Sequence, residues 1–316
     1  MDESKYPVLQ NFKKLIDKLD MRDTTKTTYK VRLQKLVQYT GKDVNWIISN
    51  CKKTIAALDK NGVTESQTRK GFVNSVMTLF KHTKGLQESK CKAYARWREC
   101  ADEIHREADL RYETLEATDK QLKAHVPWED ILKIRDKLDK SSQDYLLLCL
   151  YTMIPPARAD FNKVRIYKKN EEVLKENKDA SYLKIEGKGK MVLVHNEFKS
   201  SDYHKYAKEL PLDLVDVIEK SLHANRREYL IVSPKTNKPY DLVNSYTKYF
   251  DRRLTKIFGK TTSINMLRHS HNLQFDLNNL TPLEKKAIAG DMMQSASTFD
   301  AYRFRIPKEN EKKSKE

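Results

Sequence analysis

Apolar side chains in the first 118 residues recur every three or four positions, which is the spacing of one face of a helix. Polar residues that favour helix starts precede two of these series, at 24–28 and 64–68. A third helix-prone segment, Ser89–Glu116, is long and highly charged. The pattern predicts a helical domain over residues 1–118. The apolar positions that define its first helices are Tyr29, Leu33, Leu36, Val37, Trp46, Ile47, Ile48, Phe72, Val76, Leu79 and Phe80.

A polar stretch at 117–123 indicates a connector, and we place the domain boundary between residues 118 and 119. Two helices are predicted after it, over 128–138 and from Ser141 or Ser142 to Leu150. The second is apolar enough to be buried, and it must stop at Pro155-Pro156 because proline disfavours helix in the residue before it. Arg158 therefore follows a buried helix, which would hold its charged side chain in a fixed position.

Short β-prone runs replace the helical pattern in the middle of the chain. Gly187 and Gly189 separate two of them and indicate a hairpin turn. The last run contains Pro211, which suits an edge strand. We expect a small antiparallel sheet inserted into a helical domain, with Lys199 at its tip, so the fold class is mainly α with a small antiparallel β-sheet (α+β). The runs are 164–167, 182–185, 191–194 and 209–212.

Helices resume after the sheet, over 213–224 and 242–258. A later helix carries Asn265 and Arg268 three positions apart, so their side chains share one face. Thr281-Pro282-Leu283-Glu284 has the form of a capping box with proline in the first turn, and predicts a helix to Asp291 or Met292. A turn at 292–295 follows, and the segment from Thr298 leads to Tyr302.

The composition adds a strong positive charge to this picture. Lys and Arg number 61 against 44 Asp and Glu, which gives a net charge of +17. Residues 1–118 hold 23 basic and 16 acidic side chains, and residues 119–316 hold 38 and 28, so both parts share the excess. A polyanion such as nucleic acid would account for it, and on charge alone a soluble basic protein accounts for it equally well.

Targeting and redox signals favour an intracellular protein. No apolar run approaches the ~20 residues that a membrane span needs, and the first five residues do not resemble a signal peptide. We therefore expect no membrane contact. The four cysteines form no CxxC pair and read as reduced thiols. They are Cys51, Cys91, Cys100 and Cys149.

Two arginines and a tyrosine could hold and attack a phosphodiester without a metal ion. Arg158 and Arg268 are permanently charged and fork-shaped, which suits the oxygens of a phosphorane. Tyr302 could act as the nucleophile. The alternatives are a salt bridge from Arg158 to Asp160 and an ordinary core position for Tyr302, one of 16 tyrosines.

Other kinds of site find little support. His269 and His271 form an HxH pair, but no carboxylate or cysteine set accompanies them, so we expect no metal and assign His269 to supporting the arginine helix. Eight glycines and no GxxxxGK[ST] argue against a phosphate-binding loop. We expect no cofactor and no small-molecule substrate.

These residues, in this order, resemble the tyrosine recombinase (phage integrase) superfamily. Arg158 in PPARAD resembles the first arginine of that family, and Lys199 in FKSSDYHKYAKELPL its hairpin lysine. Arg268 in NMLRHS resembles the second arginine, and Tyr302 in DAYRF the nucleophile. The PPARAD and NMLRHS motifs look closer to those of recombinases of eukaryotic mobile elements and of large DNA viruses or their satellites than to those of bacterial chromosome-dimer resolvases.

The resemblance implies a catalytic domain over 119–316 with a mobile tail from about 305, and a helical SAM-like DNA-clamp domain over 1–118. It implies cutting and rejoining of double-stranded DNA through a 3′-phosphotyrosyl intermediate, by a homotetramer on two duplexes, wherever host or viral DNA lies. Lys199 would protonate the departing 5′-oxygen. A solvated lysine is the alternative, because Lys205 and Lys208 are close by.

Two positions depart from the family pattern. Asn265 stands where the family has histidine, and Gln294 stands where it has a second histidine or tryptophan. Spacing from Tyr302 would instead put Met293 there, but we prefer Gln294 because an amide can donate a hydrogen bond to phosphate. Three interpretations stay open: a site-specific recombinase or integrase, a type IB topoisomerase, and an inactive DNA-binding descendant of a recombinase.

Overall fold

The computed structural model describes residues 6–173, 180–187, 189–196, 206–276 and 279–306. Contacts between residues divide the chain into two compact units, Met1–Thr114 and Leu115–Glu316. The division falls four residues before the boundary at 118/119 that the sequence suggested. Within the described ranges, no helix is long and apolar enough to cross a membrane.

The first unit is built from helices packed around one apolar core. The predicted helix starts hold in part: α5 begins at Ser66, where the Glu65 carboxylate accepts the backbone N–H groups of Gln67 and Thr68, whereas α2 begins at Asp23 without a side-chain cap. Trp97 is buried, and its indole N–H donates to the carbonyl of Ile48 at 2.9 Å. The helices are α1 (Pro7–Asp17), α2 (Asp23–Thr40), α3 (Val44–Ser49), α4 (Cys51–Lys60), α5 (Ser66–His82), α6 (Leu86–Ser89) and α7 (Cys91–Glu113).

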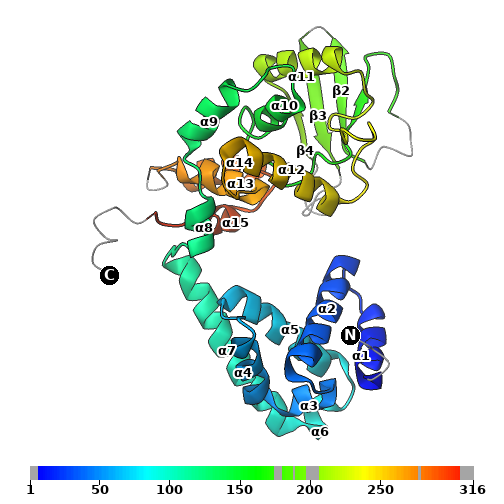
Figure 1. Ribbon diagram of the computed structural model, residues 1–316, viewed down its shortest axis with the longest axis vertical. Coiled ribbons are helices and arrows are strands. Elements are labelled where there is room, and N and C mark those ends of the chain that lie inside the picture. Colours follow the sequence, from blue (N-terminus) through cyan, green and yellow to red (C-terminus); the bar gives the residue numbers. More distant parts are fainter. Residues whose placement is uncertain (1–5, 174–179, 188, 197–205, 277–278, 307–316) are drawn as a thin grey trace. The chain divides into compact units, whose positions relative to one another are not determined.

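The second unit combines helices with a small sheet that lies at one side of it (Figure 1). The polar stretch predicted as a connector contains α8, because Thr118 and Gln121 exchange the two hydrogen bonds of a capping box. The predicted start at Thr281 is confirmed by the same motif with Glu284. The helices are α8 (Asp119–Ala124), α9 (Trp128–Asp136), α10 (Gln143–Leu150), α11 (Leu212–Ala224), α12 (Val243–Phe258), α13 (Ile264–Leu273), α14 (Pro282–Asp291) and α15 (Ala296–Ala301).

The sheet has the order β1-β2-β3-β4, with β1 Arg165–Tyr167, β2 Tyr182–Gly187, β3 Lys190–His195 and β4 Tyr206–Glu209. The pairs β2–β3 and β3–β4 are antiparallel as predicted, but β1 is parallel to β2, so the sheet is mixed. The long connection after β1 lets the chain return to the same end of the sheet, which a tight turn cannot do.

The fourth strand lies earlier than the sequence suggested. It ends at Glu209, and Pro211, which cannot donate to a ladder, becomes the N-cap of α11. The segment that contains Lys199 connects β3 to β4 and lies outside the described residues, as do residues 307–316 of the predicted tail.

The core of the second unit is centred on α10, in which every residue from Tyr145 to Leu150 is buried. Side chains of β2, β3, α11, α12 and α13 join it. His195, at the end of β3, is also buried, with Phe161 and Tyr206 against its ring. This packing fixes the turn after α10, from which Arg158 emerges.

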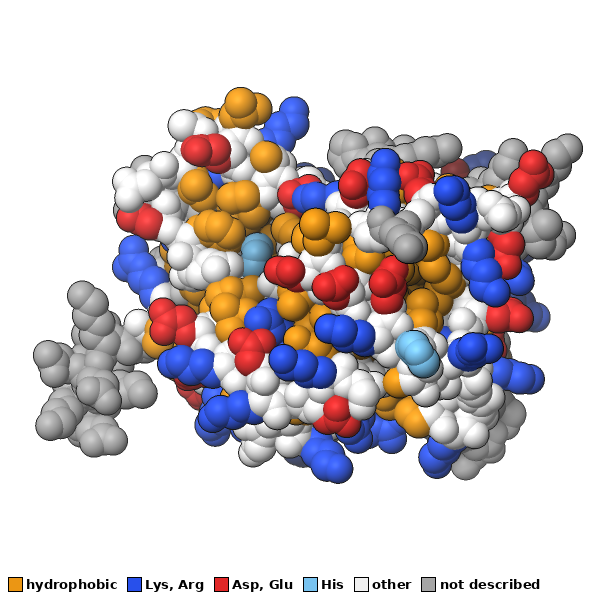
Figure 2. Space-filling view, turned by 90° about the horizontal axis from the view of Figure 1, so that it is seen from above, with side chains coloured by type: hydrophobic (Ala, Val, Ile, Leu, Met, Phe, Trp, Pro, Cys, Tyr) orange, Lys and Arg blue, Asp and Glu red, His pale blue; other side chains and the backbone are white. Residues whose placement is uncertain are grey.

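Charges are mixed on the face shown in Figure 2. Lysine and arginine alternate there with aspartate and glutamate, and apolar side chains show between them. The excess positive charge of the chain is therefore not concentrated on this face.

Candidate active site

Arg268 connects three distant segments of the second unit. Its helix, α13, begins after Ser263, whose hydroxyl accepts the backbone N–H of Met266. The side chain is fully buried, and Nη1 donates to the carbonyls of Pro156 at 2.8 Å and Met292 at 3.3 Å. Nη2 donates to Oε1 of Gln294. The arginine thus holds the turn after α10 and the turn after α14 against α13.

The charge of Arg268 is partly offset by its surroundings. Burial lowers the pKa of its guanidinium, while the neighbouring Tyr302 and Asp160 raise it. Within the described part of the chain, its Nε has no hydrogen-bond partner although it is buried. A charge kept in such a place needs compensation from nearby groups.

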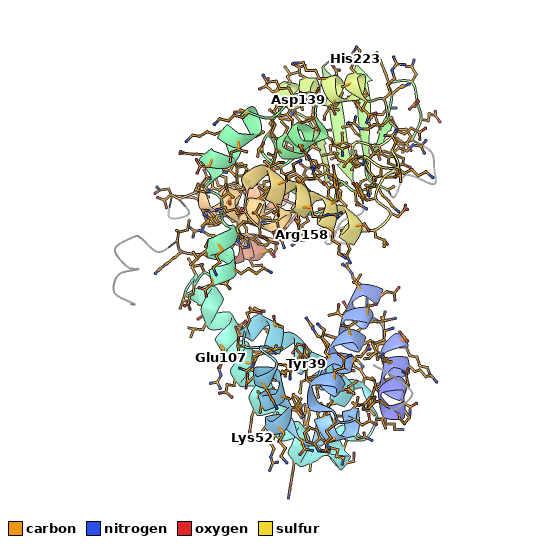
Figure 3. The ribbon with its side chains drawn as sticks, in the orientation of Figure 1. Tyr39, Lys52, Glu107, Asp139, Arg158 and His223 are labelled. Atoms are coloured by element: carbon orange, nitrogen blue, oxygen red, sulfur yellow. The ribbon has the colours of Figure 1, made fainter. Side chains whose placement is uncertain are left out.

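Arg158 lies next to this arrangement and is half-buried. Its backbone carbonyl accepts the Tyr151 hydroxyl at 2.5 Å, and its backbone N–H donates to the Asp160 carboxylate at 3.1 Å. Its charge acts on Arg268, lowering the pKa of that guanidinium. Figure 3 shows Arg158 in the same part of the unit as α12 and α13. The two arginines predicted for the site are therefore neighbours.

Asp160 contributes a negative charge near both arginines. Burial raises the pKa of its carboxyl, and the charges of Arg268 and Arg158 act in the opposite direction. The sequence suggested Asp160 only as a salt-bridge partner of Arg158; the structure shows it accepting that residue's backbone N–H and lying within electrostatic reach of both arginines. The carboxylate two positions after Arg158 was the available signal, but its relation to Arg268 depends on the fold.

Tyr302 is the C-cap residue of α15 and is half-buried. The guanidinium carbon of Arg268 lies 5.1 Å from the centre of its ring, within the range of a cation–π contact. Its hydroxyl donates to Oδ1 of the exposed Asn265 at 3.5 Å. The predicted nucleophile, second arginine and substituted histidine position therefore meet at one place.

His269 also contacts the segment that carries Tyr302. Its Nδ1 donates to the backbone carbonyl of Tyr302, and since a carbonyl only accepts, Nδ1 carries the proton. The two ring centres are 4.7 Å apart, and Phe304 lies 5.3 Å from the same imidazole. We predicted that His269 supports the arginine helix; its contacts are with the segment that carries Tyr302.

Gln294 is buried and bound to Arg268 through its carbonyl oxygen. Its Nε2 donates to Sδ of Met292 at 3.5 Å, so the N–H group that was expected to face a phosphate is directed into the protein. The neighbouring Met293, the other residue considered for this position, is also buried, and its φ of 53° places it in the left-handed region. Here Gln294 positions the arginine.

Lys199 cannot be placed, because it lies outside the described residues. Of the two lysines considered beside it, Lys208 on β4 is described, and it pairs with the Asp291 carboxylate at 2.6 Å. This ion pair connects the sheet to the end of α14.

Metal ligands do not gather in the described ranges, where no cluster of three His, Cys, Asp or Glu side chains could hold an ion. The HxH pair is divided between two environments. His269 bonds to the Tyr302 carbonyl, whereas His271 packs edge-on against Trp128 at 5.1 Å.

A helical unit with this small sheet has the fold of tyrosine recombinase catalytic domains. The chain is similar to the lambda integrase (75–356) dimer bound to a COC′ core site, with a TM-score of 0.58 and 13% identity over 95% of this chain and 96% of that one. At this identity the likeness establishes the fold alone.

Two further recombinase structures align along the chain with lower scores. XerA recombinase has a TM-score of 0.40 and 10% identity over 97% of this chain and 96% of its own. XerH bound to difH in a pre-cleavage complex has a TM-score of 0.41 and 13% identity over 98% and 94%. No protein-family model and no curated protein sequence matches the chain.

Proposed function

We propose that this protein is a site-specific DNA recombinase or integrase that cuts and rejoins DNA through a 3′-phosphotyrosyl intermediate. The proposal rests on one observation: the guanidinium carbon of Arg268 lies 5.1 Å from the centre of the Tyr302 ring, and Arg158 is within electrostatic reach of Arg268. These residues are far apart in the sequence, and the fold brings Arg268 against a tyrosine that is only half-buried, with a second arginine near that guanidinium.

In this mechanism the Tyr302 hydroxyl attacks the scissile phosphorus and the 5′-oxygen leaves. Arg158 and Arg268 stabilise the charge on the non-bridging oxygens, where fixed cations are most effective as the phosphorane forms. The energy of the phosphodiester is conserved in the phosphotyrosyl bond, so attack by the free 5′-hydroxyl restores the strand. Proton delivery to the leaving oxygen is assigned to Lys199, on sequence grounds.

Double-stranded DNA is the proposed partner, bound by both units. Each carries an excess of basic side chains, and the structure with a TM-score of 0.58 is a dimer bound to its DNA core site. We extend this to a homotetramer on two duplexes, because strand exchange requires two cut sites. The kinship with recombinases of mobile elements and viruses rests on the wording of the PPARAD and NMLRHS motifs.

An inactive DNA-binding protein is the second candidate, and the surroundings of Arg268 favour it. Both terminal nitrogens of this arginine already donate to protein groups, and its side chain is 0% exposed. Contact with a phosphate therefore requires that the turn at Met292–Gln294 move or exchange its hydrogen bonds for the ligand. Asn265 and Gln294 also lack the imidazole that could carry charge.

Incubation with nicked suicide duplexes tests the proposal, because a trapped strand leaves a covalent protein–DNA adduct. Tyr302→Phe should abolish the adduct and leave duplex affinity unchanged, since only the hydroxyl is lost. Tyr229→Phe, at another partly buried tyrosine, is the matched control and should retain it. An adduct that survives in Tyr302→Phe would refute the assignment of the nucleophile. Relaxation of supercoiled DNA without strand exchange would instead identify a topoisomerase.

A further inference from the structure

Two cysteines lie close to each other in the first unit. Cys51 is the first residue of α4, and Cys100 lies on α7, which packs against α4. The Cys51 side chain is 4% exposed, whereas Cys100 is half-buried and can be reached from solvent. Neither residue has a role in the proposed function.

The Cys51 sulfur lies against the backbone of α7. Its thiol donates to the carbonyl of Arg96 at a sulfur–oxygen distance of 3.7 Å. In a helix that carbonyl also accepts the backbone N–H four residues later, which here belongs to Cys100. The Cys51 sulfur therefore lies near the backbone N–H of Cys100. The two thiols are within hydrogen-bonding reach of each other. The single S–H of Cys51 can turn to either acceptor.

The two thiols differ in their environment. The hydrogen bond from Cys51 lowers the pKa of the Cys100 thiol, and the positive charge of Arg69 acts in the same direction against the effect of burial. The hydrogen bond to Cys100, together with burial, raises the pKa of the Cys51 thiol. Arg69 extends from α5 and pairs with Asp59 of α4 at 3.6 Å, so its charge is held in place. Cys100 is thus the accessible nucleophile and Cys51 the thiol behind it.

We propose that Cys51 and Cys100 form a redox-active dithiol, a modification site that closes to a disulfide between α4 and α7 under peroxide. The Cys100 thiolate attacks one oxygen of hydrogen peroxide and becomes a sulfenic acid, while hydroxide leaves and takes a proton to form water. The Cys51 sulfur then attacks the sulfenic sulfur, the S–S bond forms, and a second water leaves. A dithiol reductant reverses the change.

The bond would add a covalent link between α4 and α7, which pack against each other. A crosslink between distant positions restricts the unfolded chain, so the oxidised protein should unfold at a higher temperature than the reduced protein. The inference is independent of the proposed function, because it concerns thiol chemistry in the first unit alone.

Peptide mapping of the full-length protein tests the proposal. After exposure to hydrogen peroxide and alkylation of the remaining thiols, the expected product is a linked pair of peptides containing Cys51 and Cys100, which disappears on reduction. Cys91→Ser, at the exposed cysteine on the same helix as Cys100, should still form the link. Cys100→Ser should not, and Cys51→Ser should leave a sulfenic acid at Cys100 that dimedone traps.

Wild-type protein alone can overturn the proposal, so it does not depend on the variants folding. If peroxide modifies Cys91 while Cys51 and Cys100 remain separate and open to alkylation, the proposal is wrong. A link from Cys100 to Cys91 would also refute it. Circular dichroism and thermal melts of each serine variant confirm that a lost link reflects the missing sulfur.

Discussion

The guanidinium of Arg268 lies over the ring of Tyr302, with 5.1 Å between the guanidinium carbon and the ring centre. The arginine comes from α13 and the tyrosine from the end of α15, and His269 on α13 bonds to the backbone of the same tyrosine. One helix therefore positions both the charge and the hydroxyl of the candidate site. A change in α13 should alter chemistry and folding together.

Arg268→Lys should remove the covalent adduct and also destabilise the protein. A lysine ammonium cannot reproduce the planar fork that reaches the Pro156 and Met292 carbonyls and Gln294, so buried acceptors lose their donor. Each unsatisfied group costs about 1–3 kcal/mol, which denaturant unfolding would detect. Arg252→Lys, at an exposed arginine on α12, is the control and should change neither stability nor adduct yield. Unchanged stability in Arg268→Lys would contradict the structural role.

Asn265→His should leave cleavage equal or faster. The Asn265 amide is the hydrogen-bond partner of the Tyr302 hydroxyl, and an imidazole at this exposed position could carry a proton. The gain should be largest at mildly acidic pH, where the imidazole is charged. Single-turnover cleavage measured from pH 5.5 to 8 checks this, with Asn244→His on α12 as the control. A slower variant at every pH would show that the amide itself is required.

Stability should fall as the pH is lowered from about 6.5 toward 4. Burial lowers the pKa of His195 to about 4, and burial also lowers the pKa of His271 to about 4. At pH values between these lowered pKa values and the ordinary pKa of histidine, the unfolded chain binds protons that the folded chain does not. Acid therefore favours unfolding. The full contribution, on the order of 3 kcal/mol per histidine, is present above the unfolded pKa.

Comparison of variants isolates this effect from that of the carboxylates. His195→Gln should reduce the loss of unfolding free energy between pH 7 and pH 4.5, because the titrating group is gone. His223→Gln, at an exposed histidine, should keep the wild-type loss. Equal pH dependence in all three proteins would refute the assignment to His195.

Duplex binding should weaken steeply as salt rises. Both units carry net positive charge, and each phosphate contact releases counterions on binding. A log–log plot of affinity against salt should have a slope of about −0.9 per phosphate contacted, so several contacts give a steep line. Fluorescence anisotropy from 50 to 200 mM salt measures it. A flat plot would exclude electrostatic binding by this basic chain.

Local signals were enough to predict much of the fold. The α14 start follows from Thr281 and Glu284, which satisfy each other's backbone groups within one turn, and the buried α10 follows from its unbroken apolar run. The direction of β1 did not follow, because it depends on how a long connection returns to the sheet.

The candidate site divides in the same way. Arg158, Arg268 and Tyr302 could be selected from their local motifs, and the structure brings them together. The orientation of Gln294 could not be predicted, because its amide is turned by Arg268 and Met292, which reach it only in the folded chain. The placement of Asp160 against Arg268 required the fold for the same reason.

The burial of Arg268 affects which residues would be lost first by mutation if selection no longer acted on the activity of such a chain. The arginine satisfies carbonyls of two turns inside the second unit, so folding alone would retain it. The Tyr302 hydroxyl is different, because the amide of Asn265 to which it donates is exposed. A phenylalanine would keep the packing of the ring, and drift would remove the hydroxyl first. Among related chains, a tyrosine at position 302 is therefore a better marker of retained activity than an arginine at position 268.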